Sequence, residues 1–329
     1  MVAILIPVAA LFLSFGILLA GNGLQGTLLP VRAGIEGFSP FAIGVMGASF
    51  YLGYILSCFF APRVVARVGH IRSFTVFGTI ASAAQLMHVV WVDPISWWGL
   101  RFITGACLCG LYMVMESWIN ERAGKEHRGR ILSFYQIVNL GAVTVGQMLL
   151  NLYEPAGFEL FVVASVLVSV ALVPVALTRT TAPHPLQQVR IRIPRVYAIS
   201  PVGVVACLTV GLVNGAVWTI VPLFAQSALP SIAELSLFMS LLIIGGAVFQ
   251  WPLGRWSDLI DRRWVIIMIC VGGGLSAVAL MMFGEISRIA MYALAFVYGG
   301  FTFALYAIAI AHANDQAEPE DFVEIASTL

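Results

Sequence analysis

Hydrophobic residues fill ten long runs of this chain, and polar or charged residues gather in the short stretches between them. A helix of about 20 apolar residues crosses the hydrocarbon core of a bilayer, so each run is long enough for one transmembrane helix. Because irregular backbone is excluded from lipid, the pattern predicts an all-α membrane protein. The predicted spans are 4–30, 39–60, 73–92, 97–119, 131–152, 160–178, 201–226, 235–252, 264–283 and 289–312.

The basic residues predict how these helices are oriented. Most Lys and Arg residues, 14 of 17, fall in loops on one side of the predicted membrane. Cytoplasmic loops carry the excess of positive charge, so this side is predicted to be the cytoplasm, and the N-terminus lies there too. The 14 residues are Arg63, Arg67, Arg72, Arg122, Lys125, Arg128, Arg130, Arg179, Arg190, Arg192, Arg195, Arg255, Arg262 and Arg263.

Composition agrees with a membrane protein and argues against other classes. Hydrophobic residues make up 60% of the 329 residues, whereas soluble proteins are about 45–50% apolar. The net charge of +1 comes without a basic tract, so we expect no nucleic-acid partner. The five cysteines lie in apolar runs without metal-ligand spacing, so we expect no metal and no other cofactor. No cleavage site follows the first run, which is therefore expected to be a span and not a signal peptide.

An internal repeat organises the chain. The Asn-Gly step at 22–23 recurs at 214–215, 192 residues later, and Tyr112 recurs as Tyr306, 194 residues later. Transporter halves are often such parallel repeats. We therefore predict an N-terminal bundle of six helices, a cytoplasmic linker, and a C-terminal bundle that stops after four helices, so that ten of an expected twelve spans are present. These parts are residues 1–178, 179–200 and 201–329. The chain is expected to be either a fragment or a shortened relative whose open face something else covers.

One charged stretch lies between the eighth and ninth predicted spans and packs five charges into ten residues. It resembles the signature loop of the major facilitator superfamily, in which Gly254 is followed by Asp258 and then by the basic pair Arg262 and Arg263. The resemblance implies that Asp258 latches the cytoplasmic side in one state, while the arginines bind the same carboxylate or lipid headgroups. Asp261 belongs to the same loop. The alternative is a charged loop that only sets topology.

A degraded copy of this loop stands in the first half. Arg67, Gly69 and Arg72 still resemble the family pattern, but Pro62 stands where Gly is expected and Ala66 where Asp is expected. A latch formed by this copy is therefore in doubt.

Two further patterns resemble the same superfamily. Glu121, followed after six residues by Arg128 and a glycine, resembles the loop between helices 4 and 5, and the two charges are expected to join the cytoplasmic cluster. The alternative is a pair of solvated loop charges. Arg101, followed by Gly105, resembles the helix-4 motif that the family associates with proton coupling or with anchoring a neighbouring loop. Because Arg101 is near the outer end of its span, it could instead extend to the interface.

Polar side chains inside the spans are the remaining candidates. Glu116 is the one acid placed within a span, where it could carry a proton or interact with loop charges. In the superfamily, spans 1, 4, 7 and 10 line the central cavity. The candidates for that cavity, with span 5 included, are Asn22, Gln25, Asn139, Asn214, Trp218, Tyr298 and Tyr306. Amides at lipid depth also join helices to one another, so either role is open for each of them.

The function that these patterns predict is secondary active transport of a small solute by alternating access, coupled to protons. Metalloprotease and hydrolase motifs are absent, so we expect no enzyme. The expected partners are the solute, protons and the lipid of a bacterial inner membrane. One alternative is a shortened scaffold or sensor that transports nothing. Another is efflux of amphiphilic drugs, which is disfavoured because the fifth span lacks the Gly-Pro pattern of drug antiporters. The arrangement is most similar to the YcaD-like branch of the superfamily. Cargo and oligomeric state are left open.

Overall fold

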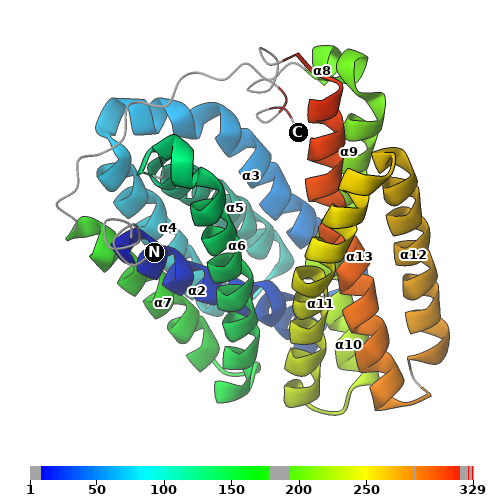
Figure 1. Ribbon diagram of the computed structural model, residues 1–329. Helices are drawn as coiled ribbons and strands as arrows, with labels where there is room; N and C mark the ends of the chain where they lie inside the picture. The colour runs from blue at the N-terminus through cyan, green and yellow to red at the C-terminus, as the bar shows by residue number, and fades with distance from the viewer. Residues whose placement is uncertain are drawn as a thin grey trace. The chain divides into compact units, whose positions relative to one another are not determined.

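The computed structural model describes residues 9–122, 124–177, 193–284, 286–318, 325 and 328, with the side chains of 120–130, 132 and 133 left out. Every element in these residues is a helix (Figure 1), so the predicted fold class is confirmed. The helices are α2 (Ala9–Ile35), α3 (Pro40–Val68), α4 (His70–Val90), α5 (Pro94–Arg122), α6 (Gly124–Leu149), η2 (Leu150–Leu152), α7 (Glu159–Ala176), α8 (Ile193–Ile199), α9 (Pro201–Thr219), α10 (Val221–Ala228), α11 (Ile232–Leu259), α12 (Arg262–Phe283) and α13 (Arg288–Asp315).

The chain divides into two compact units. The first unit is residues 1–188 with 218–226, and the second is residues 189–217 with 227–329. In the first unit α2 packs against α6 and α7, while α5 packs against α3 and α4. In the second unit α13 packs against both α11 and α12. Part of the predicted linker, residues 179–192, lies outside the described residues, and the short helix α8 follows it.

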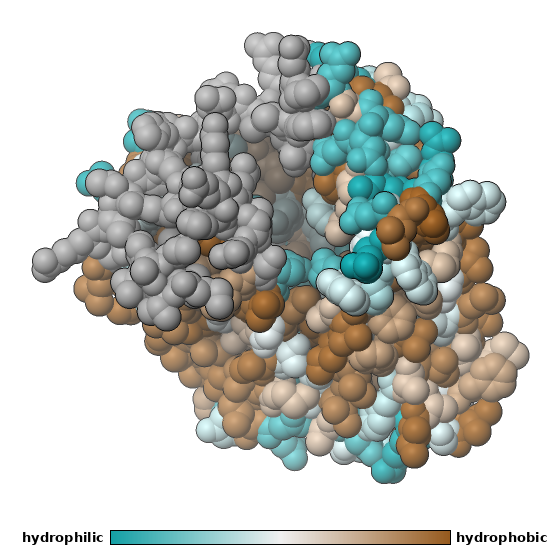
Figure 2. All heavy atoms as spheres, in the orientation of Figure 1, coloured by the Kyte–Doolittle hydropathy of each residue, from teal (hydrophilic) through white to brown (hydrophobic). Residues whose placement is uncertain are grey.

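Nine helical segments among the described residues are long and apolar enough to cross a membrane. Helix α6, which holds the fifth predicted span, is not one of them, because charged residues open it and Gln136, Asn139 and Gln147 follow. The seventh predicted span is interrupted between α9 and α10 at Ile220. Pro222 accounts for this break, since it has no N–H to donate to the preceding turn. In the lower part of the view in Figure 2, apolar side chains cover most of the surface, as contact with a bilayer requires.

The same kind of helix crossing occurs in each of the two units, which supports the predicted repeat. In the first unit, a Cβ atom on Gly53 would overlap the carbonyl oxygen of Phe102, and one on Gly105 would overlap that of Phe50. In the second unit, glycines 245 and 299 meet the carbonyl oxygens of residues 296 and 242 in the same way. These glycines are 192 and 194 residues from their counterparts, the two shifts of the sequence repeat. Helices α3 and α5, and likewise α11 and α13, therefore approach at backbone contact.

Short polar side chains cap the starts of several spans. Ser39 accepts a hydrogen bond from the backbone N–H of Ala42 at the start of α3, and Ser231 accepts one from Glu234 at the start of α11. These two serines are again 192 residues apart. Such caps satisfy N–H groups that the helix itself leaves unpaired. They fix the first residues of these two helices.

Asp93 caps α5 and makes its cap sensitive to acid. Its carboxylate accepts a hydrogen bond of 2.9 Å from the backbone N–H of Ser96, and bonds from the Ser96 side chain and backbone lower the pKa of Asp93 below its usual value. A lowered pKa in the folded state gives stability that is present above about pH 4 and lost below it. Asn also caps helices but does not titrate. We therefore expect Asp93→Asn to match the wild-type melting temperature at pH 7 and to lose less stability between pH 5 and pH 3. Thermal unfolding in detergent measures this, and identical pH profiles would contradict it.

Candidate functional site

The signature loop of the second unit is organised around Arg262. Helix α11 ends at Leu259, and α12 begins at Arg262, where Asp261 accepts a hydrogen bond from the backbone N–H of Arg263. The Arg262 guanidinium lies 3.0 Å from a carboxylate oxygen of Asp258 and 2.5 Å from one of Asp315, which ends α13. It also donates to the hydroxyl of Ser257 at 2.9 Å. Arg262 therefore ties the α11–α12 loop to the end of α13.

Asp315 was not among the residues predicted from the sequence. The repeat contains the signal that could have found it, because a shift of 194 residues places Asp315 at the position of Glu121. The side chain of Arg262 is 20% exposed, against 67% for Asp258 and 55% for Asp315. The better buried arginine, and not Asp258, is thus the centre of the network.

A cleft of about 480 Å³ opens at this network. Its walls come from the loop and from the end of α13, and they are Ser257, Asp258, Ile260, Asp261, Arg262, Arg263, His312, Asp315 and Gln316. Gly254 lies one helical turn before Asp258 in α11, and no described atom would lie within 4 Å of a Cβ atom at this glycine. Packing within the second unit therefore does not explain this glycine.

The first-unit copy of the loop is built differently. Gly69 joins α3 to α4 with φ +88°, a conformation that favours glycine, and its N–H bonds to the carbonyl of Val65 at 2.9 Å. Arg67 and Arg72 are exposed. His70 stands where Arg262 stands in the second unit, and its Nε2 lies 3.2 Å from the Ser117 hydroxyl. An imidazole thus replaces the arginine of the second unit at this position. The side chains of Glu121 and Arg128 lie outside the described residues.

Arg101 packs against an aromatic ring inside the first unit. Its guanidinium carbon lies 4.2 Å from the centre of the Phe50 ring, a distance at which a cation is attracted to an aromatic face. Its Nε is buried without a hydrogen-bond partner in the described part of the chain. The side chain is thus held across the α3–α5 crossing.

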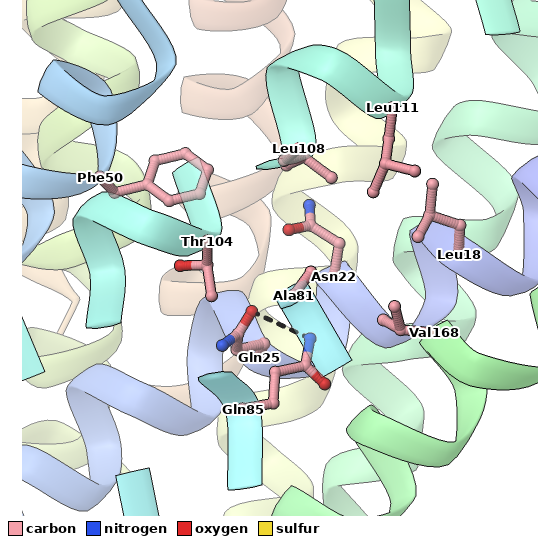
Figure 3. Close-up of a pocket in the computed structure, with 10 residues that line it drawn as sticks. All are labelled: Leu18, Asn22, Gln25, Phe50, Ala81, Gln85, Thr104, Leu108, Leu111 and Val168. Carbon is pink, nitrogen blue, oxygen red and sulfur yellow. Dashed lines mark hydrogen bonds between the residues drawn. The ribbon is translucent and has the colours of Figure 1, made fainter. Parts of the chain in front are cut away.

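An amide pair lies next to this crossing. Gln85 on α4 donates a 3.2 Å hydrogen bond to the Oε1 of Gln25 on α2 (Figure 3). Gln25 Nε2 and Gln85 Oε1 are buried without partners among the described residues. Asn22 and Thr104 line the same small cavity, whose free space of about 10 Å³ is near the minimum that one water molecule needs. Gln85 was not predicted, since nothing in its local sequence distinguishes it from a residue that joins two helices.

Glu116 forms a second polar group, together with tyrosines from three helices. It is exposed on the surface of α5, and the Tyr135 hydroxyl of α6 donates to its Oε1 at 2.8 Å. Tyr54 of α3 and Tyr112 of α5 are close enough to interact electrostatically with the same carboxylate. We call Tyr54, Tyr112, Glu116 and Tyr135 the Glu116 cluster. Its tyrosines were not predicted as site residues, because no spacing along the chain links residues of different helices.

The remaining candidates are spread over both units. Asn139 and Trp218 are half-buried. Asn214 is half-buried too, and its Oδ1 has no partner among the described residues. Tyr298 bonds to Thr302 on its own helix, and Tyr306 is exposed. Within the first unit, Gln25 thus lies in the amide pair and Glu116 in a separate cluster, while Asn139 belongs to neither.

Comparisons with known proteins agree with this architecture. The family model described as Major Facilitator Superfamily matches residues 11–326. The chain is 25% identical over 336 residues to the MFS-type transporter YcaD of Escherichia coli, covering 98% of this chain and 84% of the relative. A Yersinia pestis MFS-type transporter is 24% identical over 314 residues, which cover 92% and 78%. These matches confirm the predicted family and the YcaD-like relationship.

Solved structures share the fold at low sequence identity. The nucleoside transporter NupG superposes with a TM-score of 0.78 at 14% identity, covering 98% of this chain and 85% of that chain. The D-xylose-proton symporter superposes with a TM-score of 0.70 at 14% identity, covering 97% and 87%.

Proposed function

Because the chain belongs to the Major Facilitator Superfamily, we propose that it is a secondary active transporter that moves a small solute across the cell membrane by alternating access and is coupled to protons. The observation that carries the proposal is the glycine crossing that recurs in both units. Alternating access needs two repeated bundles that move as bodies, and backbone contact between helices makes such bodies rigid. The distribution of arginines supports a cytoplasmic N-terminus.

Glu116 is the proposed proton carrier. It is an exposed carboxylate on a membrane helix, and no Lys, Arg or His forms an ion pair with it among the described side chains. An ionisable residue at membrane depth marks an ion or substrate pathway by default. The resemblance in fold to a D-xylose-proton symporter supports a coupling of this kind.

The remaining site residues are assigned by what surrounds them. We place the Arg262 network in the gate that opens and closes at the α11–α12 loop, because it joins two helices through charges that solvent can reach. Asn22, Gln25 and Asn214 are placed at the solute pathway, since each lies on α2 or α9, and Gln25 and Asn214 each have a buried polar atom without a partner among the described residues.

The test of proton coupling is Glu116→Gln. A thermal-shift screen of metabolites and drugs on the purified protein identifies a solute, and uptake of that solute is then measured in proteoliposomes with and without a pH gradient. The wild type should accumulate the solute only with the gradient. The variant should lose this dependence, because Gln cannot bind and release a proton. Glu159→Gln, at the start of α7, serves as the matched control. Dependence on the gradient that survives in Glu116→Gln would exclude this residue as the carrier.

A further inference from the structure

The Glu116 cluster contains a carboxylate that has no positive partner among the side chains that the structure describes. Tyr135 is the hydrogen-bond donor to Glu116, and neither Arg, Lys nor His pairs with the carboxylate among the described side chains. Elsewhere in the described chain, ion pairs occupy other charged groups, Arg262 among them. Arg101 keeps its positive charge, but its guanidinium lies over the Phe50 ring and not beside Glu116. The exposed Glu116 carboxylate is therefore available to attract a cation.

Aromatic rings surround this charge on three helices. Tyr54, Tyr112 and Tyr135 all interact electrostatically with one another and with Glu116. Phe15 of α2 supports two of these rings, since it stacks on Tyr135 at 4.6 Å and meets Tyr112 edge-on at 5.5 Å. Tyr54 and Tyr112 are half-buried, so part of each ring is accessible. Aromatic rings combined with a carboxylate are the usual means of binding an organic cation.

The fold does not need this cluster. Tyr112 recurs in the second unit as Tyr306, but Ile310 stands at the position of Glu116 and Gly246 at that of Tyr54. The second unit nevertheless forms the same helix crossing. A feature that one repeat has and the other lacks is better explained by ligand binding than by packing.

We propose that the Glu116 cluster is the binding site for an apolar organic monocation, and that this cation and a proton exclude each other there. The inference rests on the proposed function and gives its solute a chemical class. When the Glu116 carboxylate binds a proton, it loses the negative charge that attracts the organic cation. Binding of the proton therefore weakens binding of the cation, and binding of the cation weakens binding of the proton. Among the described side chains, the other titratable groups that interact with Glu116 are Tyr54 on α3, Cys109 and Tyr112 on α5, and Tyr135 on α6. Thiols and phenols are ordinarily neutral at neutral pH, which leaves Glu116 as the group that binds either species.

The probes are tetraphenylphosphonium and tetraphenylborate, which have nearly the same shape and opposite charge. Binding of each to the purified full chain is measured by equilibrium dialysis, with detergent alone as the blank. The wild type should bind the phosphonium at least about tenfold more tightly than the borate, and this preference should weaken as the pH falls. Glu116→Gln should lose about tenfold in phosphonium affinity together with the pH dependence, whereas Glu159→Gln should bind as the wild type does.

Two results would overturn the proposal: equal binding of the two probes by the wild type, or unchanged phosphonium binding by a folded Glu116→Gln. If that variant does not fold, the preference of the wild type for the phosphonium over the borate, and the pH dependence of that preference, still test the proposal. The outcomes also separate this inference from the proposed function. The protein could transport another solute in a way that depends on the pH gradient and on Glu116, and yet bind no phosphonium. That result would refute the proposed substrate class and leave the proposed function standing. If no solute of the library is transported by the wild type, the proposed function fails too.

Discussion

Arg262→Ala is expected to reduce solute uptake about tenfold and to leave membrane insertion intact. The substitution removes the ion pair to Asp315 that holds the α11–α12 loop to the end of α13, together with the ion pair to Asp258 and the hydrogen bond to Ser257 at the end of α11. Because the two acids are more than half exposed, solvent screens these pairs, and their combined contribution is about 1–2 kcal/mol. Asp258→Asn removes one of the pairs and should reduce uptake less, by about two- to threefold. Initial uptake rates in proteoliposomes, corrected for the amount of inserted protein, measure both effects.

Arg255→Ala is the matched control for this experiment. Arg255 is exposed at the same end of α11, so its removal changes the local charge by the same amount without touching the network. Uptake by Arg255→Ala should stay near the wild-type rate. Equal losses in Arg255→Ala and Arg262→Ala would mean that the loop acts through its positive charge alone, as a loop that only sets topology would. If Arg262→Ala takes up the solute at the wild-type rate, the Arg262 network does not form part of the gate.

The second large effect is expected at the helix crossing. Gly105→Val should destabilise the first unit by about 3 kcal/mol or more, since overpacking typically costs about 1–3 kcal/mol and here the obstacle is backbone. The new Cβ would overlap the carbonyl oxygen of Phe50, so α3 and α5 would have to move apart. That movement would also displace the Phe50 ring from Arg101. We expect a lower yield of folded protein and a lower melting temperature in detergent.

Gly99→Val provides the control within the same helix. No described atom would lie within 4 Å of a Cβ atom at Gly99, so this substitution makes the same change in helix propensity without the overlap. Gly299→Val should repeat the effect of Gly105→Val in the second unit, where the carbonyl of Leu242 is the obstacle. A melting temperature of Gly105→Val equal to that of Gly99→Val would show that the crossing tolerates a side chain.

Much of the architecture could be predicted because it depends on spacing along the chain. The runs of apolar residues predicted the membrane helices, and the signature loop with the recurring Asn-Gly step predicted the family. The break between α9 and α10 lies at Pro222, but no feature of the sequence distinguishes this proline from Pro30, which lies inside the continuous helix α2. Proline removes one backbone donor in both places. The surrounding packing decides whether the helix bends or divides.

The partners of the site residues were the part that sequence could not supply. Asp315 pairs with Arg262, Gln85 with Gln25, and Tyr135 with Glu116, and each pair joins two different helices. In a soluble protein an apolar stripe shows which face of a helix is buried. Helices in lipid are apolar all round, so their sequences do not reveal how each is rotated against its neighbours.

The sequence by itself determined that this chain crosses a membrane several times, that its two parts repeat one another, and that it belongs to a superfamily of transporters. These conclusions need only the order and spacing of residues. The tertiary structure alone decided that Arg262 is the centre of the loop network, that Arg101 lies on an aromatic ring, and that three tyrosines surround Glu116. Such contacts depend on the rotation and depth of neighbouring helices, which packing sets after the spans have formed.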